Sequence, residues 1–388
     1  MPAKKRNPVP VRGSLQNLPR SLKAKLAAIW GTTIDDSTPR RQHSRVSRLR
    51  LALLFMLLGL ALTALGLVWM PWTAGLLPLG WIFTIGGSRY LQVSVVHFAV
   101  HNQFFTRERH NRLLAQTIST VLLITDYDTY YRDHVKNHHP IRKFARRGDP
   151  DLEFLIALGF LPGMSRDELW RHLAWTLISP RFHFLFLRGR LHSNFVGASR
   201  PRRRLAAVAF WLGVVVALAM HPAWIIPFIV LWILPLTIGY HMSSILQFAS
   251  EHLWLLPCAG EGAREHAKAL SRGRFCGDAL PDADLRGLAR LRAWARWWVR
   301  LLTLHAAVRV AVLPGDLTHH DLHHLRPTDF DWPNADAVRS EMLANGETLN
   351  ETWGLFAALD EVFVVLSSLP PMNVDEPVVI NEKLFGTM

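Results

Sequence analysis

The sequence has little cysteine: only Cys258 and Cys276 occur among 388 residues, and they do not form a CxxC pair. This scarcity excludes a disulfide framework and a thiolate-held iron or zinc module. The HExxH motif of zinc proteases is also missing. No Glu-x-x-His repeat occurs, although carboxylate-bridged di-iron bundles are built from such repeats. Any metal chemistry must therefore rest on other ligands.

Acidic residues are also few, and the chain has a formal net charge of +14 although 50% of its residues are apolar. This combination is unusual for a soluble enzyme but typical of a membrane protein with cationic loops on one side. A nucleic-acid-binding protein would also be basic, but it would not need apolar runs long enough to span a bilayer. We therefore expect an integral, multi-pass protein of a bacterial inner membrane, without a nucleic-acid partner.

Four apolar runs predict an all-α membrane protein with four transmembrane helices in two hairpins. The first run has 20 residues without a charge, enough to cross the hydrocarbon core. Pro227 and Pro235 are expected to kink the last one. The predicted spans cover about 51–70, 76–96, 205–220 and 223–243.

Basic residues orient these spans. Arginines precede the first and third spans, whereas the turns within the hairpins lack Lys and Arg. By the positive-inside rule, both termini are then cytoplasmic. We predict a basic, partly disordered N-terminal region (1–48), a membrane domain (49–335) and a cytoplasmic C-terminal region (336–388). Arg89, late in the second span, is expected to extend to the cytoplasmic interface, with substrate anchoring as the alternative.

Arginine and tryptophan recur at helical spacing in residues 285–310. This pattern predicts an interfacial amphipathic helix with Trp294, Trp297 and Trp298 at headgroup depth. An ordinary helix packed on a cytoplasmic domain is the alternative.

Histidines gather in four clusters at or beyond the predicted cytoplasmic span ends. In "HFAVH" and in "HVKNHH", two histidines four positions apart share one face of a helix. "HVKNHH" adds an adjacent imidazole about 100° further round the helix. The histidines in these clusters are His97, His101, His134, His138, His139, His252, His319, His320, His323 and His324.

This number of imidazoles limits the metal chemistry. Structural zinc needs only four ligands, often thiolates, whereas these clusters provide four or five imidazoles for each of two metal ions. Imidazole suits iron, copper, nickel or zinc, and only a redox metal can activate dioxygen.

The clusters resemble the histidine boxes of the membrane fatty acid desaturase superfamily, which includes desaturases, membrane hydroxylases and carotenoid ketolases. The similarity extends from about Trp81 to Asn334, in family order. "HFAVH", "YYRDHVKNHH" and "HDLHHLRP" are similar to the three boxes, "GDPDLEF" to the Asp-Pro element, and "EHLW" to an additional ligand segment. The resemblance implies a cytoplasmic helical cap that holds two iron ions (Fe²⁺). The implied ligands are His97, His101, His134, His138, His139, His252, His320, His323 and His324.

The chain departs from the family pattern at two positions. Phe98 stands where the first box usually has an acidic residue, and Phe248 stands where some relatives have an amide. The carboxylate that would orient an imidazole is then either missing or supplied from elsewhere. The candidates are Asp128, Asp133 and Asp321. In the third box His319 competes with His320, because both 319/323 and 320/324 are four apart; the family pattern favours His320.

The resemblance implies a dioxygen-dependent desaturase that introduces a double bond into a fatty acyl or similar lipid chain. Hydroxylation or ketolation of a lipid or hydrocarbon is the alternative reaction, and a non-catalytic membrane metal-binding protein is an alternative of another class. No catalytic residue beyond the metal ligands is implied. Because the chain has no dinucleotide-binding fingerprint and no haem-binding extension, electrons must come from an external donor of the ferredoxin, rubredoxin or cytochrome type.

Overall fold

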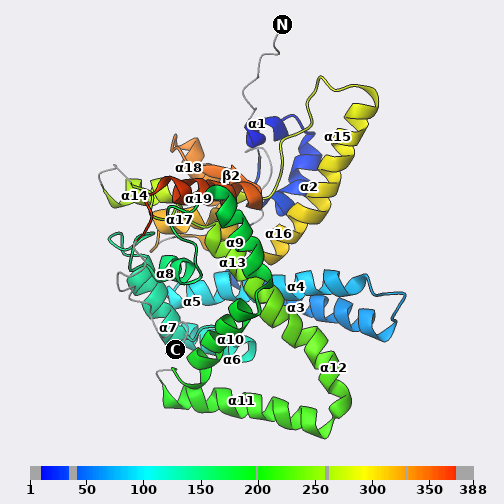
Figure 1. The fold of residues 1–388 in the computed structure, drawn as a ribbon, viewed down its shortest axis with the longest axis vertical. Helices are drawn as coiled ribbons and strands as arrows, with labels where there is room; N and C mark the ends of the chain where they lie inside the picture. The colour runs from blue at the N-terminus through cyan, green and yellow to red at the C-terminus, as the bar shows by residue number, and fades with distance from the viewer. Residues whose placement is uncertain (1–9, 35–41, 198–199, 258–261, 329, 373–388) are drawn as a thin grey trace.

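The computed structural model describes residues 10–34, 42–197, 200–257, 262–328 and 330–372, most of which are helical (Figure 1). The strands assigned among these residues are β1 (Gly273–Phe275) and β2 (Glu351–Trp353), which pair in parallel. The disorder predicted near the N-terminus falls largely on residues 1–9, outside the described residues.

The first hairpin consists of α3 (Arg45–Val68) and α4 (Leu76–Tyr90), which lie side by side (Figure 1). The Ser44 side chain begins α3 by accepting a hydrogen bond from the Ser47 amide. Glycines allow the two backbones to approach closely, since a Cβ on Gly59 or Gly80 would overlap the partner helix. Small residues at such a contact are typical of helices packed within a membrane.

Within the described residues, three helices are long and apolar enough to cross a membrane: Arg45–Val68, Pro201–Met220 and Pro222–Ala249. The predicted second span is α4, which has 15 residues and continues through a π-helical turn, η1 (Leu91–Val96), into α5 (His97–Val100). This continuation is buried in the protein, so the fourth span stays a prediction. The expectation that Arg89 extends to the interface is wrong: its side chain is 1% exposed and hydrogen-bonds Gln92 and Gln247 in the interior.

The second hairpin is formed by α11 (Pro201–Met220), along the lower edge of Figure 1, and by a long broken helix that leads from there back to the centre of the molecule. Large apolar side chains on it are exposed, as lipid contact requires. Wide π-helical segments follow Pro227 and begin at Pro235, because proline has no amide N–H for the α-helical ladder. The broken helix comprises η3 (Pro222–Trp224), α12 (Ile225–Phe228), η4 (Ile229–Ile233), η5 (Pro235–Gly239) and α13 (Tyr240–Ala249).

The N-terminal helices α1 (Val11–Leu15) and α2 (Arg20–Trp30) pack with α15 (Gly287–Arg300) and η6 (Leu301–His305). Trp297 is buried in this small core, so its side chain is not exposed for contact with lipid headgroups. The other side of α15 exposes leucines and a valine. An interfacial position of this helix therefore stays a prediction.

The remaining helices surround the histidine clusters. They are α6 (Glu108–Leu122), α7 (Tyr127–Tyr130), η2 (Tyr131–His138), α8 (Pro150–Ala157), α9 (Arg166–Ile178), α10 (Pro180–Phe195), α14 (Ala263–Leu270), α16 (Ala306–Ala311), η7 (Leu317–His319), α17 (His320–Leu325), η8 (Trp332–Asn334), α18 (Ala335–Ala344) and α19 (Leu355–Ser368).

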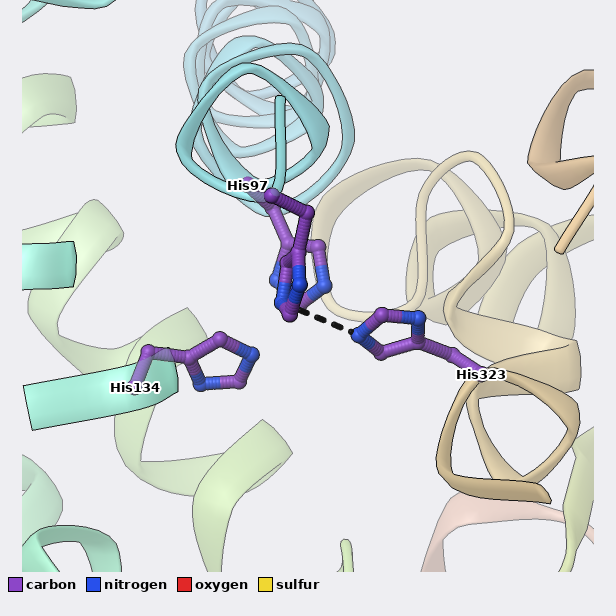
Figure 2. Close-up of side chains that lie close together, drawn as sticks. His97, His134 and His323 are labelled. Carbon is purple, nitrogen blue, oxygen red and sulfur yellow. Dashed lines mark hydrogen bonds between the residues drawn. The ribbon is translucent and has the colours of Figure 1, made fainter. Parts of the chain in front are cut away.

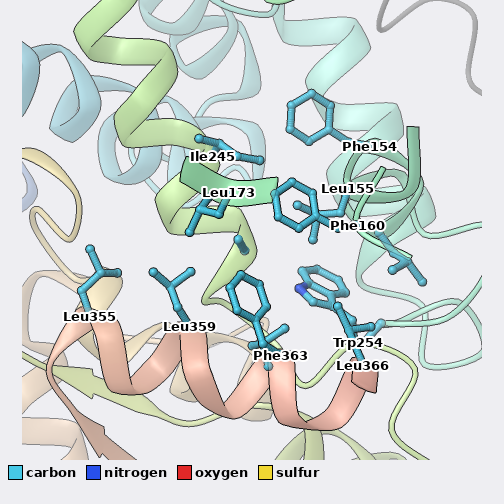
Figure 3. Close-up of a cluster of buried hydrophobic side chains, with 14 of the residues drawn as sticks. Phe154, Leu155, Phe160, Leu173, Ile245, Trp254, Leu355, Leu359, Phe363 and Leu366 are labelled. Carbon is cyan, nitrogen blue, oxygen red and sulfur yellow. The ribbon is translucent and has the colours of Figure 1, made fainter. Parts of the chain in front are cut away.

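The largest core joins the C-terminal helix to the centre of the molecule (Figure 3). Leu359 and Phe363 of α19 lie in one cluster with Phe160, Ile245 and Trp254, and all five side chains are buried. Burial of each such side chain contributes roughly 1.5–3 kcal/mol. This core fixes α13 and α8, which flank the histidines.

Candidate metal centre

The first pair of imidazoles lies at the buried end of the α4–α5 helix. His97 begins α5 and His101 follows its last residue, so the two rings are one turn apart with centroids 5.0 Å from each other. The helix is anchored here by Phe98, which stacks on Trp332 with ring centroids at 4.7 Å and nearly parallel planes.

The second cluster lies on the π-helix η2 rather than on the α-helix that its spacing predicts. The His139 amide donates to the His134 carbonyl, five positions back. The wider turn brings His134 next to both following histidines. Its ring stacks on that of His138, with centroids 5.1 Å apart, and its Nε2 lies 2.9 Å from that of His139.

The third cluster lies on α17. His320 and His324 are one turn apart, with their Nε2 atoms separated by 3.1 Å. His319, in the preceding 3₁₀ turn, is directed elsewhere, because its Nδ1 accepts a hydrogen bond from Arg339 Nε at 3.1 Å. His252 follows α13; it is fully buried, and neither ring nitrogen has a hydrogen-bond partner within the described protein.

These segments assemble two groups of imidazoles. In each of two sets of four, one nitrogen per ring lies within 4.8 Å of the other three; the sets are His97, His101, His134 and His323, and His138, His252, His320 and His324. The first group is shown in part in Figure 2, where His97, His134 and His323 point toward one another. His139 joins it through its Nε2, 3.1 Å from that of His323. The first group is His97, His101, His134, His139 and His323, and the second is His138, His252, His320 and His324. All nine histidines implied as ligands are thus brought together.

The separations between the imidazole nitrogens suit binding of two metal ions better than they suit a network of hydrogen bonds. A neutral imidazole has one N–H, so the mutual contacts of His101, His139 and His323 through Nε2 atoms cannot all be satisfied as hydrogen bonds. Two nitrogens that bind a metal at right angles, each at about 2.1 Å, lie about 3 Å apart. The observed separations of 2.9–3.4 Å match this arrangement. The buried, unpartnered Nε2 of His97 is explained in the same way.

Most of the imidazole rings are neutral, and a neutral ring is the form that binds a metal ion. Burial, together with neighbouring imidazoles, holds the pKa values of His139, His323 and His324 well below the usual range, so these rings are neutral. His138 differs. Burial lowers its pKa, but Asp149 and Asp151 outweigh that effect and raise it to about 9. A metal ion at this ring must therefore displace a proton.

Two polar groups orient imidazoles from outside. Asp149 presents both carboxylate oxygens to His138 Nδ1 at 2.9 Å. The Tyr130 hydroxyl lies 3.1 Å from His97 Nδ1. Glu251 lies on the inner side instead, because its Oε1 is 3.3 Å from His320 Nε2, the nitrogen that also faces His324. Sequence reasoning did not assign these roles, although Asp149 lies in "GDPDLEF" and Glu251 directly precedes His252.

The carboxylates that were predicted for this orienting role have other partners. Asp128 pairs with Arg112, Asp133 with Arg132 and Asp321 with Arg339. The pattern of residue types does not reveal which carboxylate faces a ring, since that depends on how the helices pack.

A cavity of about 130 Å³ adjoins both groups of imidazoles. His97, His134 and His320 form part of its wall. Aromatic residues, among them Phe154 and Phe248, line another part. A small organic group that enters this cavity comes next to imidazoles of both groups.

Comparison with known proteins identifies one family. The model described as fatty acid desaturase matches residues 74–354, which include all nine imidazoles of the two groups. No curated protein matches the chain.

Proposed function

The chain belongs to the fatty acid desaturase family, and from this we propose that it is a membrane di-iron oxidoreductase that uses dioxygen to desaturate an aliphatic chain. Family membership implies oxidoreductase activity. We propose the nine imidazoles of the two groups as the ligands of two iron ions.

One observation carries this proposal: two adjacent groups, of five and four buried or half-buried imidazoles, adjoin the same cavity. When bound, two ferrous ions supply the capacity to reduce dioxygen and to oxidise an unactivated C–H bond. The residues of this chain hold the ligands in place, exclude bulk water and orient the substrate. Asp149 and Tyr130 fix the rings of His138 and His97 from outside.

Hydroxylation is the second candidate reaction, and the cavity favours it to some extent. Asp133, Asp151 and Glu251 make part of its wall polar, as does Tyr130, so a polar product could be accommodated. The two reactions differ in their products: desaturation removes two hydrogens from the substrate, whereas hydroxylation adds one oxygen.

Electrons are proposed to come from a ferredoxin, a rubredoxin or a cytochrome. We place the metal centre on the cytoplasmic side of a bacterial inner membrane, where such a donor is accessible. The excess of arginine and lysine in the chain would favour an acidic donor.

The test is expression of the chain with a ferredoxin and its reductase, followed by mass spectrometry of lipid and small-molecule extracts. The control is the double variant His323→Ala/His324→Ala, which removes one imidazole from each group. We expect an oxygen-dependent product in cells with the unaltered chain alone. A purified protein that keeps its iron but shows no oxygen- and reductant-dependent product in any extract would favour a non-catalytic metal-binding protein.

A further inference from the structure

Two arginines line the cavity beside the imidazoles, Arg89 and Arg190. Arg89 is 1% and Arg190 6% exposed, and among the described residues neither forms an ion pair with a carboxylate. Both guanidinium groups lie against the ring of Tyr240, at 5.2 and 4.5 Å from its centroid. A buried cation is costly unless an anion compensates its charge.

The carboxylates of the cavity do not provide this compensation. Each is paired with another basic group: Asp133 with Arg132, Asp151 with His138 and Glu251 with Arg274. The positive charges of Arg89 and Arg190 are therefore left without a direct counter-charge in the cavity wall.

The two arginines differ in their free hydrogen-bonding capacity. Arg190 donates to the backbone carbonyls of Leu122, Leu123 and Leu236 and also contacts His241, so four of its five N–H donors are in use. Arg89 contacts only two amide oxygens, those of Gln92 and Gln247, and its Nε is buried without a partner. Arg89 therefore has three donors left for a ligand, whereas Arg190 has one.

We propose that the substrate carries a carboxylate, bound by Arg89, close to the carbon that is oxidised. Arg89 and the imidazoles of both groups line one cavity of about 130 Å³, about ten times the minimum that a single water needs. A ligand held at Arg89 therefore has its reacting carbon only a few bonds from the carboxylate. Phe154, Phe186 and Phe248 supply the apolar wall for an aliphatic portion. This proposal rests on the proposed function and narrows its substrate to an aliphatic carboxylic acid.

A second role for Arg89 has to be separated from this one. Arg89 donates to Gln247 Oε1, Gln247 Nε2 donates to Glu251 at 2.7 Å, and Glu251 faces His320. Through this chain Arg89 could simply position a metal ligand. A positioning role predicts loss of iron on substitution, whereas a binding role predicts loss of affinity for the anion with iron retained.

The test compares hexanoate with hexanamide, which has the same shape but no charge, in titrations of the purified full-length protein. We expect hexanoate to bind at least about tenfold more tightly, because hydrogen bonds to charged groups are the strong ones. Arg89→Gln should abolish this preference at unchanged iron content. Gln92→Glu should abolish it too, because the substitution is nearly isosteric and gives Arg89 a carboxylate of its own. Arg203→Gln, at a buried arginine outside the cavity, is the control and should keep the preference.

Equal affinity for hexanoate and hexanamide in the unaltered protein would overturn the proposal. So would an Arg89→Gln variant that loses iron but still prefers hexanoate. If Arg89→Gln does not fold, Gln92→Glu decides, and persistence of the preference in that variant overturns the proposal. Failure of the proposed function would be seen in a separate measurement: the unaltered protein would contain no iron, or it would show no oxygen-dependent turnover.

Discussion

His134 and His139 meet Nε2 to Nε2 at 2.9 Å, five positions apart on a π-helical turn. In an α-helix the His139 ring would point to another side of the helix axis than the His134 ring, so the two rings could not bind the same metal ion. The wider turn lets one short segment contribute to both groups: His134 and His139 to the first, and His138 to the second. The local helix type is therefore part of the metal centre.

The metal content can be checked directly. We expect about two irons per chain, a stoichiometry taken from the family resemblance, each surrounded by nitrogen ligands. X-ray absorption at the iron edge should show imidazole scattering and no sulfur, because the described cysteine, Cys276, is not part of either group. Removal of iron with a chelator should abolish turnover, and ferrous iron should restore it. Full activity of a zinc-loaded protein without oxygen would contradict the proposed chemistry.

His319 and His320 form a matched pair of test positions. His320 lies in the second group, whereas His319 accepts from Arg339. We expect His320→Ala to be iron-poor and inactive. His319→Ala should keep its iron and measurable activity but lose roughly 1–3 kcal/mol of stability, because the buried Arg339 loses an acceptor. Iron analysis and thermal unfolding distinguish them, and equal loss of iron in both variants would mean that His319 is itself a ligand.

Asp149 is expected to act through His138. Asp149→Asn keeps the shape of the side chain but removes the charge that holds the Nδ1 proton. Loss of such an outer partner typically lowers metal affinity or activity about 10- to 100-fold. Asp128→Asn is the matched control, because Asp128 pairs with Arg112 away from the rings. Competition titrations with an iron chelator measure the difference, and identical affinities for the two variants would exclude a role of Asp149.

The membrane topology can be tested with single cysteines. Cysteine at Ala223, in the turn of the second hairpin, should react with an impermeant maleimide from outside, whereas cysteine at Arg202 should not. The reverse pattern would contradict a cytoplasmic metal centre.

The native Cys276 should not interfere with this labelling, because burial raises the pKa of its thiol to about 12. At pH 8 only about one thiol in ten thousand is then ionised, and only the thiolate reacts. Cys258, which lies outside the described residues, is replaced by serine.

The resemblance to the family was sufficient to name the nine imidazoles that the fold brings together, and their role as metal ligands stays a prediction. The sequence could not reveal the π-helical turn at residues 131–138, since the wide turn depends on the surrounding packing. The contacts of Asp149, Glu251 and Tyr130 with the rings were also hidden, because they come from segments that meet only in the folded chain.

The span predictions show a similar limit. Hydropathy located the apolar runs, but it could not show that the second run ends inside the protein. For the same reason Arg89 was expected at the interface, where a long cationic side chain usually finds water. Its burial depends on Gln92 and Gln247, and Gln247 is more than 150 positions away in the sequence.

The core that α19 completes has a consequence for biosynthesis. The imidazoles span residues 97–324, and α13 and α8 beside them are fixed by a helix that ends at Ser368. While the ribosome is still translating the chain, the early histidines are already made but have no rigid frame. We therefore expect iron to be loaded stably only after α19 has left the exit tunnel, and a chain truncated before Leu355 should reach the membrane without a metal centre.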